Sequence, residues 1–261
     1  MIIKNQNYQP IWTHEKSEVY HANKEYVNSS SLKRILKSPK SFLSSLTEEN
    51  KPTPAMQLGS LIHTAILEPQ MFEQVYVVEP NFGDCRTAAN KARRDEWRAQ
   101  NVGRVPIDQE TQRIVVGISE SIYKHADAQT ILAKGHKERS GYYADPETGI
   151  LCRIRPDFYS EGMSAIVDLK TSESCEEESF SRTMWNYRYD IQMAMYSHGA
   201  EVIDGKSVDN QIFIVAEKTA PFEVAVYIAD NKVVQMGLSY YRHALKKLSK
   251  SIETNDWSSF C

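Results

Sequence analysis

The sequence predicts an α/β protein in which helices flank a central mixed β-sheet and in which the amino-terminal part is helical. Strand-like runs rich in β-branched and aromatic residues gather in two clusters between residues 137 and 228. Helical segments precede these clusters, separate them and follow them, which is the order expected for a mixed sheet with flanking helices. A chain of 261 residues, 41% of them hydrophobic, is long enough for one large core.

The chain shows no internal repeat, low-complexity segment or flexible linker, so we expect residues 1–261 to form a single domain. Residues 1–53 read as an extended lead-in followed by short helices, and residues 54–261 as the core. Ser30 or Ser31 is expected to cap the first helix, and Pro39 divides the helical stretch in two.

This early helical stretch also has a basic side. Lys33 and Arg34 belong to it, together with two further lysines. Charges on such a helix are most often solvated, and the alternative is a phosphate contact made by Ser30 or Arg34.

Residues 55–68 (AMQLGSLIHTAILE) predict an amphipathic helix that ends before Pro69. Gly59 and His63 are four residues apart and therefore share a face. A lone histidine on an apolar helix is more often a hydrogen-bonded core residue than a metal ligand. Gly59 would let another backbone or a substrate approach closely, at a helix-propensity cost of about 1 kcal/mol relative to alanine.

Residues 85–104 form a strongly basic stretch that follows a predicted strand over residues 74–78. Arg93 and Arg94 lie at its centre, beside Trp97, and could form a wall that contacts DNA. A solvated helical excursion explains the same composition equally well. Helices over residues 107–123 and 128–132 are expected to follow.

Residues 149–171 (GILCRIRPDFYSEGMSAIVDLKT) carry the strongest functional signal. Strands over residues 150–155 and 165–169 are expected to form a hairpin around the polar turn at residues 160–162. Asp157 follows the first run, and Asp168 and Lys170 share one face of the second. Two carboxylates with the Leu169 backbone carbonyl suit Mg²⁺ or Mn²⁺, and Lys170 could orient water or stabilise charge on a phosphate.

Three further side chains are candidates for the same site. Glu138 begins a predicted strand over residues 137–144 and is a possible additional acid. Gln192 and Tyr196 are an i, i+4 pair on a helix predicted for residues 176–200, where amphipathic packing is the default interpretation. Strands over residues 211–216 and 222–228 and a long helix over residues 230–252, with Arg242 on its basic side, complete the chain.

Charge and cysteine content limit the classes of function. A net charge of −3 and an isoelectric point near 6.2 argue against a protein that coats nucleic acid through a basic surface. Cys85, Cys152, Cys175 and Cys261 form no CxxC pair and read as reduced thiols. No apolar run approaches the ~20 residues that span a bilayer, and the first residues lack a secretory signal, so we expect a cytoplasmic protein.

Taken together, the segments LGSLIHTAILEP, DPETGILCRIRPD, IVDLKT and YRYDIQMAMYSHG resemble the RecE-type exonuclease (exonuclease VIII) group. This group lies in the RecB-like branch of the PD-(D/E)xK nuclease superfamily. There the Pro-Asp and Asp-x-Lys core is preceded by a GxxxH helix and followed by a QxxxY helix. The matching residues here are Gly59 with His63 and Gln192 with Tyr196, and the resemblance runs from about residue 26 to residue 257.

The resemblance implies a metal-dependent exonuclease that degrades one strand of linear duplex DNA from its 5′ end. Asp157 and Asp168 would bind Mg²⁺, or Mn²⁺ in its place, together with the Leu169 carbonyl, and His63 would join the same site or a second one. Lys170 would activate water beside the scissile phosphate.

The same resemblance gives Gln192 and Tyr196 the role of orienting the lysine or the DNA. The 3′ overhang would pass to a phage single-strand-annealing protein, and a homo-oligomeric ring could enclose the DNA.

Three alternatives stay open from the sequence. One is a nuclease of the same branch that cuts single strands or flaps, because the shared site does not set polarity. Another is a non-catalytic protein that binds DNA ends, against which the intact Asp157, Asp168 and Lys170 argue. The last is a hydrolase of a small phosphoester, which the salt dependence of binding would separate from a DNA enzyme.

Overall fold

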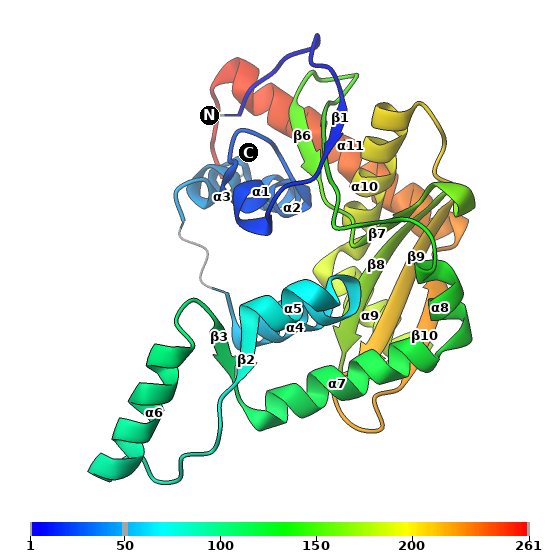
Figure 1. Ribbon diagram of the computed structural model, residues 1–261. Helices are drawn as coiled ribbons and strands as arrows, with labels where there is room; N and C mark the ends of the chain where they lie inside the picture. Colours follow the sequence, from blue (N-terminus) through cyan, green and yellow to red (C-terminus); the bar gives the residue numbers. More distant parts are fainter. Residues whose placement is uncertain (1, 49–51, 260–261) are drawn as a thin grey trace.

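A five-stranded mixed sheet forms the centre of the computed structural model, which describes residues 2–48 and 52–259 (Figure 1). Its strand order is β10–β9–β8–β7–β4; β8 and β9 are parallel and the other neighbouring pairs antiparallel. The predicted α/β fold with a central mixed sheet is confirmed. The strands are β4 (His136–Lys137), β7 (Phe158–Ser160), β8 (Ala165–Ser172), β9 (Asn210–Glu217) and β10 (Val224–Ile228).

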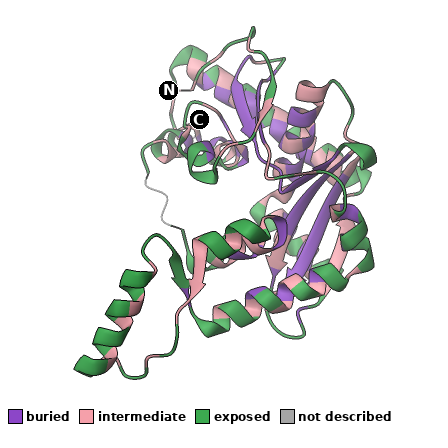
Figure 2. Ribbon diagram, viewed as in Figure 1, coloured by how far each residue is buried: buried purple, intermediate pink, exposed green. Residues whose placement is uncertain are grey.

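Helices cover both faces of this sheet, so its central strands are buried (Figure 2). Val167 and Leu169 of β8 point into a core cluster on one face, whereas Ile166 points into a second cluster on the other. This alternation follows from the two-residue period of a strand. The first face is covered by α4 (Pro54–Leu67), α7 (Gln109–Lys124) and α8 (Ala126–Leu132), and the second by α9 (Glu177–Tyr187) and α10 (Tyr189–Asp204).

A second, three-stranded antiparallel sheet has the order β1–β5–β6. With α2, α10 and α11 it encloses a third core cluster that contains Leu32, Tyr143, Ile154 and Leu245. Its strands are β1 (Ile11–Thr13), β5 (Ser140–Ala144) and β6 (Leu151–Ile154). The helices in this part of the molecule, apart from α10, are α1 (Ser17–Ala22), α2 (Ser29–Lys37), α3 (Pro39–Ser45) and α11 (Asn231–Thr254).

The predicted hairpin between residues 150–155 and 165–169 is wrong in its pairing. β6 pairs with β5, and the strand that pairs with β8 is the short β7. Pro156 follows β6 and has no N–H to donate, so the ladder ends there and the chain passes from one sheet to the other. The expected polar turn is a 3₁₀ turn, Glu161–Met163, that joins β7 to β8.

The strand predicted for residues 137–144 divides in the same way. His136–Lys137 joins the large sheet, Ser140–Ala144 joins the small one, and Glu138 between them has a φ of 49°. The two crossings lie against each other, because the Glu138 N–H donates to the Asp157 carbonyl over 3.1 Å. Both acidic residues therefore stand where the chain changes sheets.

Three other predicted elements differ in detail. Residues 69–75 are helical (α5, Pro69–Val75), so the strand predicted from residue 74 shortens to β2 (Tyr76–Val78). The long helix predicted for residues 176–200 is two helices, separated by Arg188 at a φ of 54°. Helix α2 is capped by Asn28, whose side chain accepts from the Ser31 N–H, and not by Ser30 or Ser31.

The basic stretch at residues 85–104 forms an arm that projects away from both sheets (Figure 1). Its helix, α6 (Ala88–Gln100), contains no buried residue, and the arm is anchored by the parallel pair of β2 with β3 (Val105–Ile107). Because no side chain of this helix packs into the core, core packing does not constrain its sequence, and its surface is open to solvent or to a binding partner.

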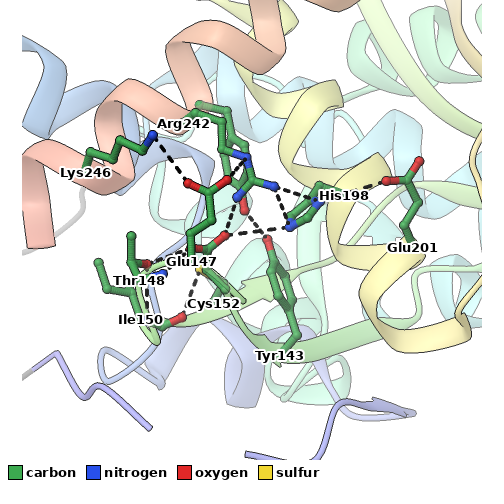
Figure 3. Close-up of polar contacts among 11 residues, drawn as sticks. Tyr143, Glu147, Thr148, Ile150, Cys152, His198, Glu201, Arg242 and Lys246 are labelled. Atoms are coloured by element: carbon green, nitrogen blue, oxygen red, sulfur yellow. Dashed lines mark hydrogen bonds and ion pairs between the residues drawn. The ribbon is translucent and has the colours of Figure 1, made fainter. Parts of the chain in front are cut away.

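Arg242 of α11, which the sequence placed on the basic side of the last helix, is partly buried and paired with residues of the β5–β6 turn and of α10. Its Nη1 atom donates to Asp145 Oδ1 over 2.6 Å, and its Nη2 atom lies 3.2 Å from a ring nitrogen of His198 (Figure 3). Glu147 lies on the outer side of the same group, within 3.6 Å of Arg242 Nε. Helix α11 is thereby fixed to the turn that joins β5 to β6.

Cys85, Cys152 and Cys175 are free thiols, and Cys261 lies outside the described residues. Over residues 2–48 and 52–259, no helix is both long enough and apolar enough to cross a membrane.

Candidate active site

The end of β8 presents a buried carboxylate beside an ammonium group. Asp168 is fully buried, and Lys170 Nζ lies in direct contact with its Oδ2 atom. The predicted common face for Asp168 and Lys170 is confirmed. On helix α10, the Gln192 Nε2 atom donates to Asp168 Oδ1 over 2.8 Å and to the Tyr196 hydroxyl over 3.3 Å. The i, i+4 pair thus reaches the acid of β8.

Asp157 lies beside the same strand. Its Oδ2 atom accepts from the Leu169 N–H over 2.6 Å, and its Oδ1 atom is 3.4 Å from His63 Nδ1. His63 on α4 also donates from Nε2 to the Leu169 carbonyl over 2.8 Å. His63, Asp157 and Leu169 therefore form one connected cluster, whereas the resemblance had left open whether His63 belongs to the same site as Asp157.

Gly59, one turn before His63, has open space around it. A Cβ atom there would meet nothing within 4 Å, so no described part of the chain makes the close approach that a glycine permits. Room is left on this face of α4 for a ligand.

Glu138 completes the acidic group, and Arg155 holds it in place. Arg155 Nε donates to Glu138 Oε2 over 2.8 Å, while its Nη1 atom donates to the Ser140 hydroxyl over 2.8 Å and to the Glu15 carbonyl over 3.1 Å. Arg155 is itself buried, so this charge-assisted pair is well shielded from solvent.

The donor atoms suit a divalent cation. One ligand atom each from His63, Glu138 and Asp157 lies within 4.8 Å of the other two. Asp168 is outside this triplet, and its buried Oδ2 atom lies against the Lys170 ammonium. Carboxylate and carbonyl oxygens favour Mg²⁺ and Mn²⁺, and the imidazole adds affinity for Mn²⁺. The residues present therefore fit a bound metal ion.

Burial and neighbouring charges shift the pKa values of His63, Glu138 and Lys170. Burial alone would lower the pKa of His63, but the negative charge of Asp157 outweighs it and raises the pKa to about 9. Burial and Asp157 raise the pKa of Glu138 to about 7, against the effect of Arg155. Burial opposes the charged form of Lys170, yet Asp168 and Asp157 raise its pKa, so this group remains an ammonium ion.

A cleft of about 550 Å³ opens beside Glu138. It runs between the amino-terminal segment around Glu15 and the exposed side of α4 and α5, and Arg155 and Lys137 contribute to its wall. Glu138 is therefore reachable from outside the fold.

The predicted DNA contacts are not gathered at this site. Ser30 and Arg34 are exposed on α2, and Arg34 lies 3.6 Å from Glu48. Arg93 and Arg94 belong to α6 on the projecting arm, where Arg94 lies 3.4 Å from Asp95 (Figure 1).

The sequence reasoning missed Arg155 and Lys33 as neighbours of the site. Lys33 Nζ lies 5.6 Å from the centroid of the Tyr189 ring, which also contacts Lys170. A signal for Arg155 was present in CRIRPD, where Arg153 and Arg155 interrupt an apolar strand-like run. Such arginines are buried only when they are paired.

A mixed sheet that carries two buried acids, with a lysine two residues beyond the second, defines the PD-(D/E)xK class of nuclease folds. The chain belongs to the family of PDDEXK-like domains of unknown function, DUF3799, whose model matches residues 28–261. Family and site together support a nuclease, and nucleases of this class generally use divalent metal ions.

One solved structure agrees with the fold. A candidate exonuclease from Eubacterium rectale aligns with a TM-score of 0.63 at 16% identity, over 95% of this chain and 91% of that chain. A phage-related exonuclease from Haemophilus somnus aligns with a TM-score of 0.38 at 14% identity, over 88% of this chain and 96% of that one. No curated protein matches the sequence.

Proposed function

We propose that the protein is a metal-dependent exodeoxyribonuclease of the RecE type. It degrades one strand of linear double-stranded DNA from the 5′ end and leaves a 3′ overhang. The observation that supports a metal-dependent nuclease is the cluster of Asp157, Asp168 and Lys170, reached by His63 from one helix and by Gln192 from another. The 5′ polarity and the duplex substrate rest on the resemblance to the RecE-type group.

His63, Glu138, Asp157 and the Leu169 carbonyl, with Asp168 beside them, would hold the cation, which we take to be Mg²⁺ with Mn²⁺ as a substitute. A bound cation lowers the pKa of a water molecule and neutralises charge on the phosphate. Arg155 keeps the Glu138 carboxylate aimed at this group.

Lys170 would place its ammonium beside the scissile phosphate. There it would orient the attacking water and stabilise the negative charge that develops on the phosphate. Gln192 holds the neighbouring Asp168, and Tyr196 accepts a hydrogen bond from Gln192, so this pair orients the acid against which Lys170 rests.

The DNA would be held by contacts outside the site. We assign phosphate contacts to Ser30 and Arg34 on α2 and to Arg93 and Arg94 on the arm, all on exposed or partly exposed surface. The partners of a 5′-to-3′ enzyme of this type are duplex ends, a phage single-strand-annealing protein and further copies of the chain in a ring. We also propose that residues 1–261 act as one domain, since Lys33 and Arg155 link the early segments to the site.

The polarity is tested with linear duplexes labelled separately at the 5′ and the 3′ end and incubated with Mg²⁺. Early release of the 5′ label, with the 3′ label retained until late, is the expected result. Early release of the 3′ label would reverse the proposed direction. Digestion confined to single-stranded DNA would leave the site in place and replace the duplex substrate with a single strand or flap.

The metal-binding role of His63 predicts that His63→Ala weakens Mn²⁺ binding by about tenfold or more, because an imidazole ligand and its contact with Asp157 are both lost. Isothermal titration calorimetry measures the change. The matched control is His136→Ala, since His136 lies on β4 and contacts Glu161 instead of the acidic group. Equal Mn²⁺ affinity in wild type and His63→Ala would remove His63 from the ligand set.

A further inference from the structure

The junction between α9 and α10 brings aromatic side chains to the surface beside Lys170. Arg188 separates the two helices in a left-handed conformation, with φ 54° and ψ 51°. Such a conformation is uncommon for a residue with a side chain and persists where the surroundings enforce it. It places Tyr187 and Tyr189 in a stacked arrangement, with ring centroids 5.8 Å apart and planes 15° from parallel.

The stacked pair connects the solvent to the catalytic lysine. Tyr187 is 62% exposed, whereas Tyr189 is partly buried beneath it. Lys170 Nζ lies 4.7 Å from the Tyr189 ring centroid, and Lys33 Nζ from α2 lies 5.6 Å from the same centroid. Two ammonium groups therefore meet one ring whose stacked neighbour is open to solvent.

Lys33 adds a second positive charge beside the Tyr189 ring. Its burial, together with the charge of Lys170, lowers its pKa to about 8, although Asp168 and Asp190 oppose the change. A bound anion at this position would favour the charged form of Lys33.

The junction is held rigidly. The Arg188 guanidinium donates to both oxygens of the buried Asp190, over 3.0 and 2.8 Å, and its Cζ atom lies 3.8 Å from the centroid of the Tyr240 ring. Helix α11 can approach this closely because residue 237 is glycine, where a Cβ atom would come within 2.4 Å of the Asp190 carbonyl oxygen. Tyr240 is 40% exposed, so the surface continues from Tyr187 across Arg188.

We propose that the surface of Lys33, Tyr187, Arg188, Tyr189 and Tyr240, named here the junction platform, binds unpaired nucleobases of the strand that enters the active site. Exposed aromatic rings interleaved with cations are the arrangement that stacks bases and holds the phosphates between them. A base in the interior of a duplex has both faces covered by its neighbours, so the platform cannot accept a base from a continuous duplex.

This inference rests on the proposed function, since it names the form of the DNA next to the site. A strand end would separate from its complement before reaching Lys170, and the separated base would stack on Tyr187. The platform would thus select free ends over continuous duplex, because only an end opens without breaking pairs on both sides.

The test measures the binding of single-stranded DNA to the protein in the absence of metal, so that no cleavage takes place. Fluorescently labelled single-stranded oligothymidylate and an abasic oligonucleotide of the same length are titrated with the full chain in EDTA. Wild type is expected to bind the oligothymidylate about tenfold more tightly than the abasic strand, and Tyr187→Ala to bind the two equally. Tyr187→Phe keeps the ring and should keep the preference, as should Ile228→Ala, which removes an exposed apolar side chain from the edge strand β10.

Equal affinity of wild type for the two strands would overturn the inference, as would an unchanged preference in Tyr187→Ala. Both results are independent of nuclease activity. A base preference that depends on Tyr187, in a protein that does not cleave DNA, would support the platform and refute the proposed function. Cleavage without any base preference would do the reverse.

Discussion

Replacing Lys170 with methionine is expected to lower the rate of metal-dependent DNA cleavage by about a thousandfold. The variant removes the ammonium that would stabilise charge on the scissile phosphate, and losses of about 10²–10³ are typical when one such preorganised group is removed. Methionine keeps most of the length of the side chain and can contact the Tyr189 ring through its sulfur, although the cation is lost. Initial rates on linear duplex at saturating Mg²⁺ measure the effect.

The control for Lys170→Met is Lys232→Met, which removes an exposed lysine near the start of α11. It should leave the rate close to that of wild type. Duplex binding without metal is expected to change only slightly in Lys170→Met, since one phosphate contact is a small part of the total electrostatic binding. A Lys170→Met protein that cleaves at the rate of wild type would show that the ammonium takes no part in the reaction.

Arg242→Met is expected to lower the free energy of unfolding by about 3 kcal/mol, because it leaves the carboxylate of Asp145 buried without its ion-pair partner. For a chain of this size such a loss lowers the melting temperature by roughly 6–12 °C. The double variant Asp145→Asn/Arg242→Met removes both charges and should recover much of the loss. A double variant that is no more stable than Arg242→Met would mean that the ion pair is not the cause.

The same pair predicts how stability depends on pH. Burial alone would raise the pKa of Asp145, but contacts with His198 and Thr148 and the charge of Arg242 lower it to about 2. A carboxyl group whose pKa is lowered by folding stabilises the fold above its unfolded value near 3.8, and this contribution is lost as the pH falls from about 4 to about 2. In acid unfolding monitored by circular dichroism, the difference between wild type and Asp145→Asn should therefore shrink over that interval.

Periodicity predicted the elements of the sheet but not their pairing. The pattern of β8 fixed which side chains share a face, so the contact of Asp168 with Lys170 could be foreseen. Pairing depends on where a chain leaves one sheet for another, and here that is decided by Pro156 and by the backbone of Glu138. Neither the positive φ of Glu138 nor the alternative partner strand has a local signature in the sequence.

The site was predictable where its residues follow a helical or strand period. Spacing showed only that His63, and Gln192 with Tyr196, lie on defined helix faces; the family resemblance assigned them to the site, and the structure brings them to the same cluster. Arg155 and Lys33 were missed because their partners are distant in sequence, and a buried cation cannot be told from a solvated one by spacing alone. The pairing of Arg242 with Asp145 was missed for the same reason.

A metal-dependent exonuclease needs a free DNA end, and this requirement is tested by comparing two substrates. The release of acid-soluble nucleotide is measured from linear duplex DNA and from the same DNA as a covalently closed circle. Wild type is expected to release nucleotide from the linear form in Mg²⁺ or Mn²⁺ and to leave the circle intact. Activity should be lost when EDTA is added to wild type, and the Asp168→Asn variant should be inactive with either metal. No release from the linear form with either metal, or release that survives Asp168→Asn, would contradict the assignment of a metal-dependent exonuclease site to this group.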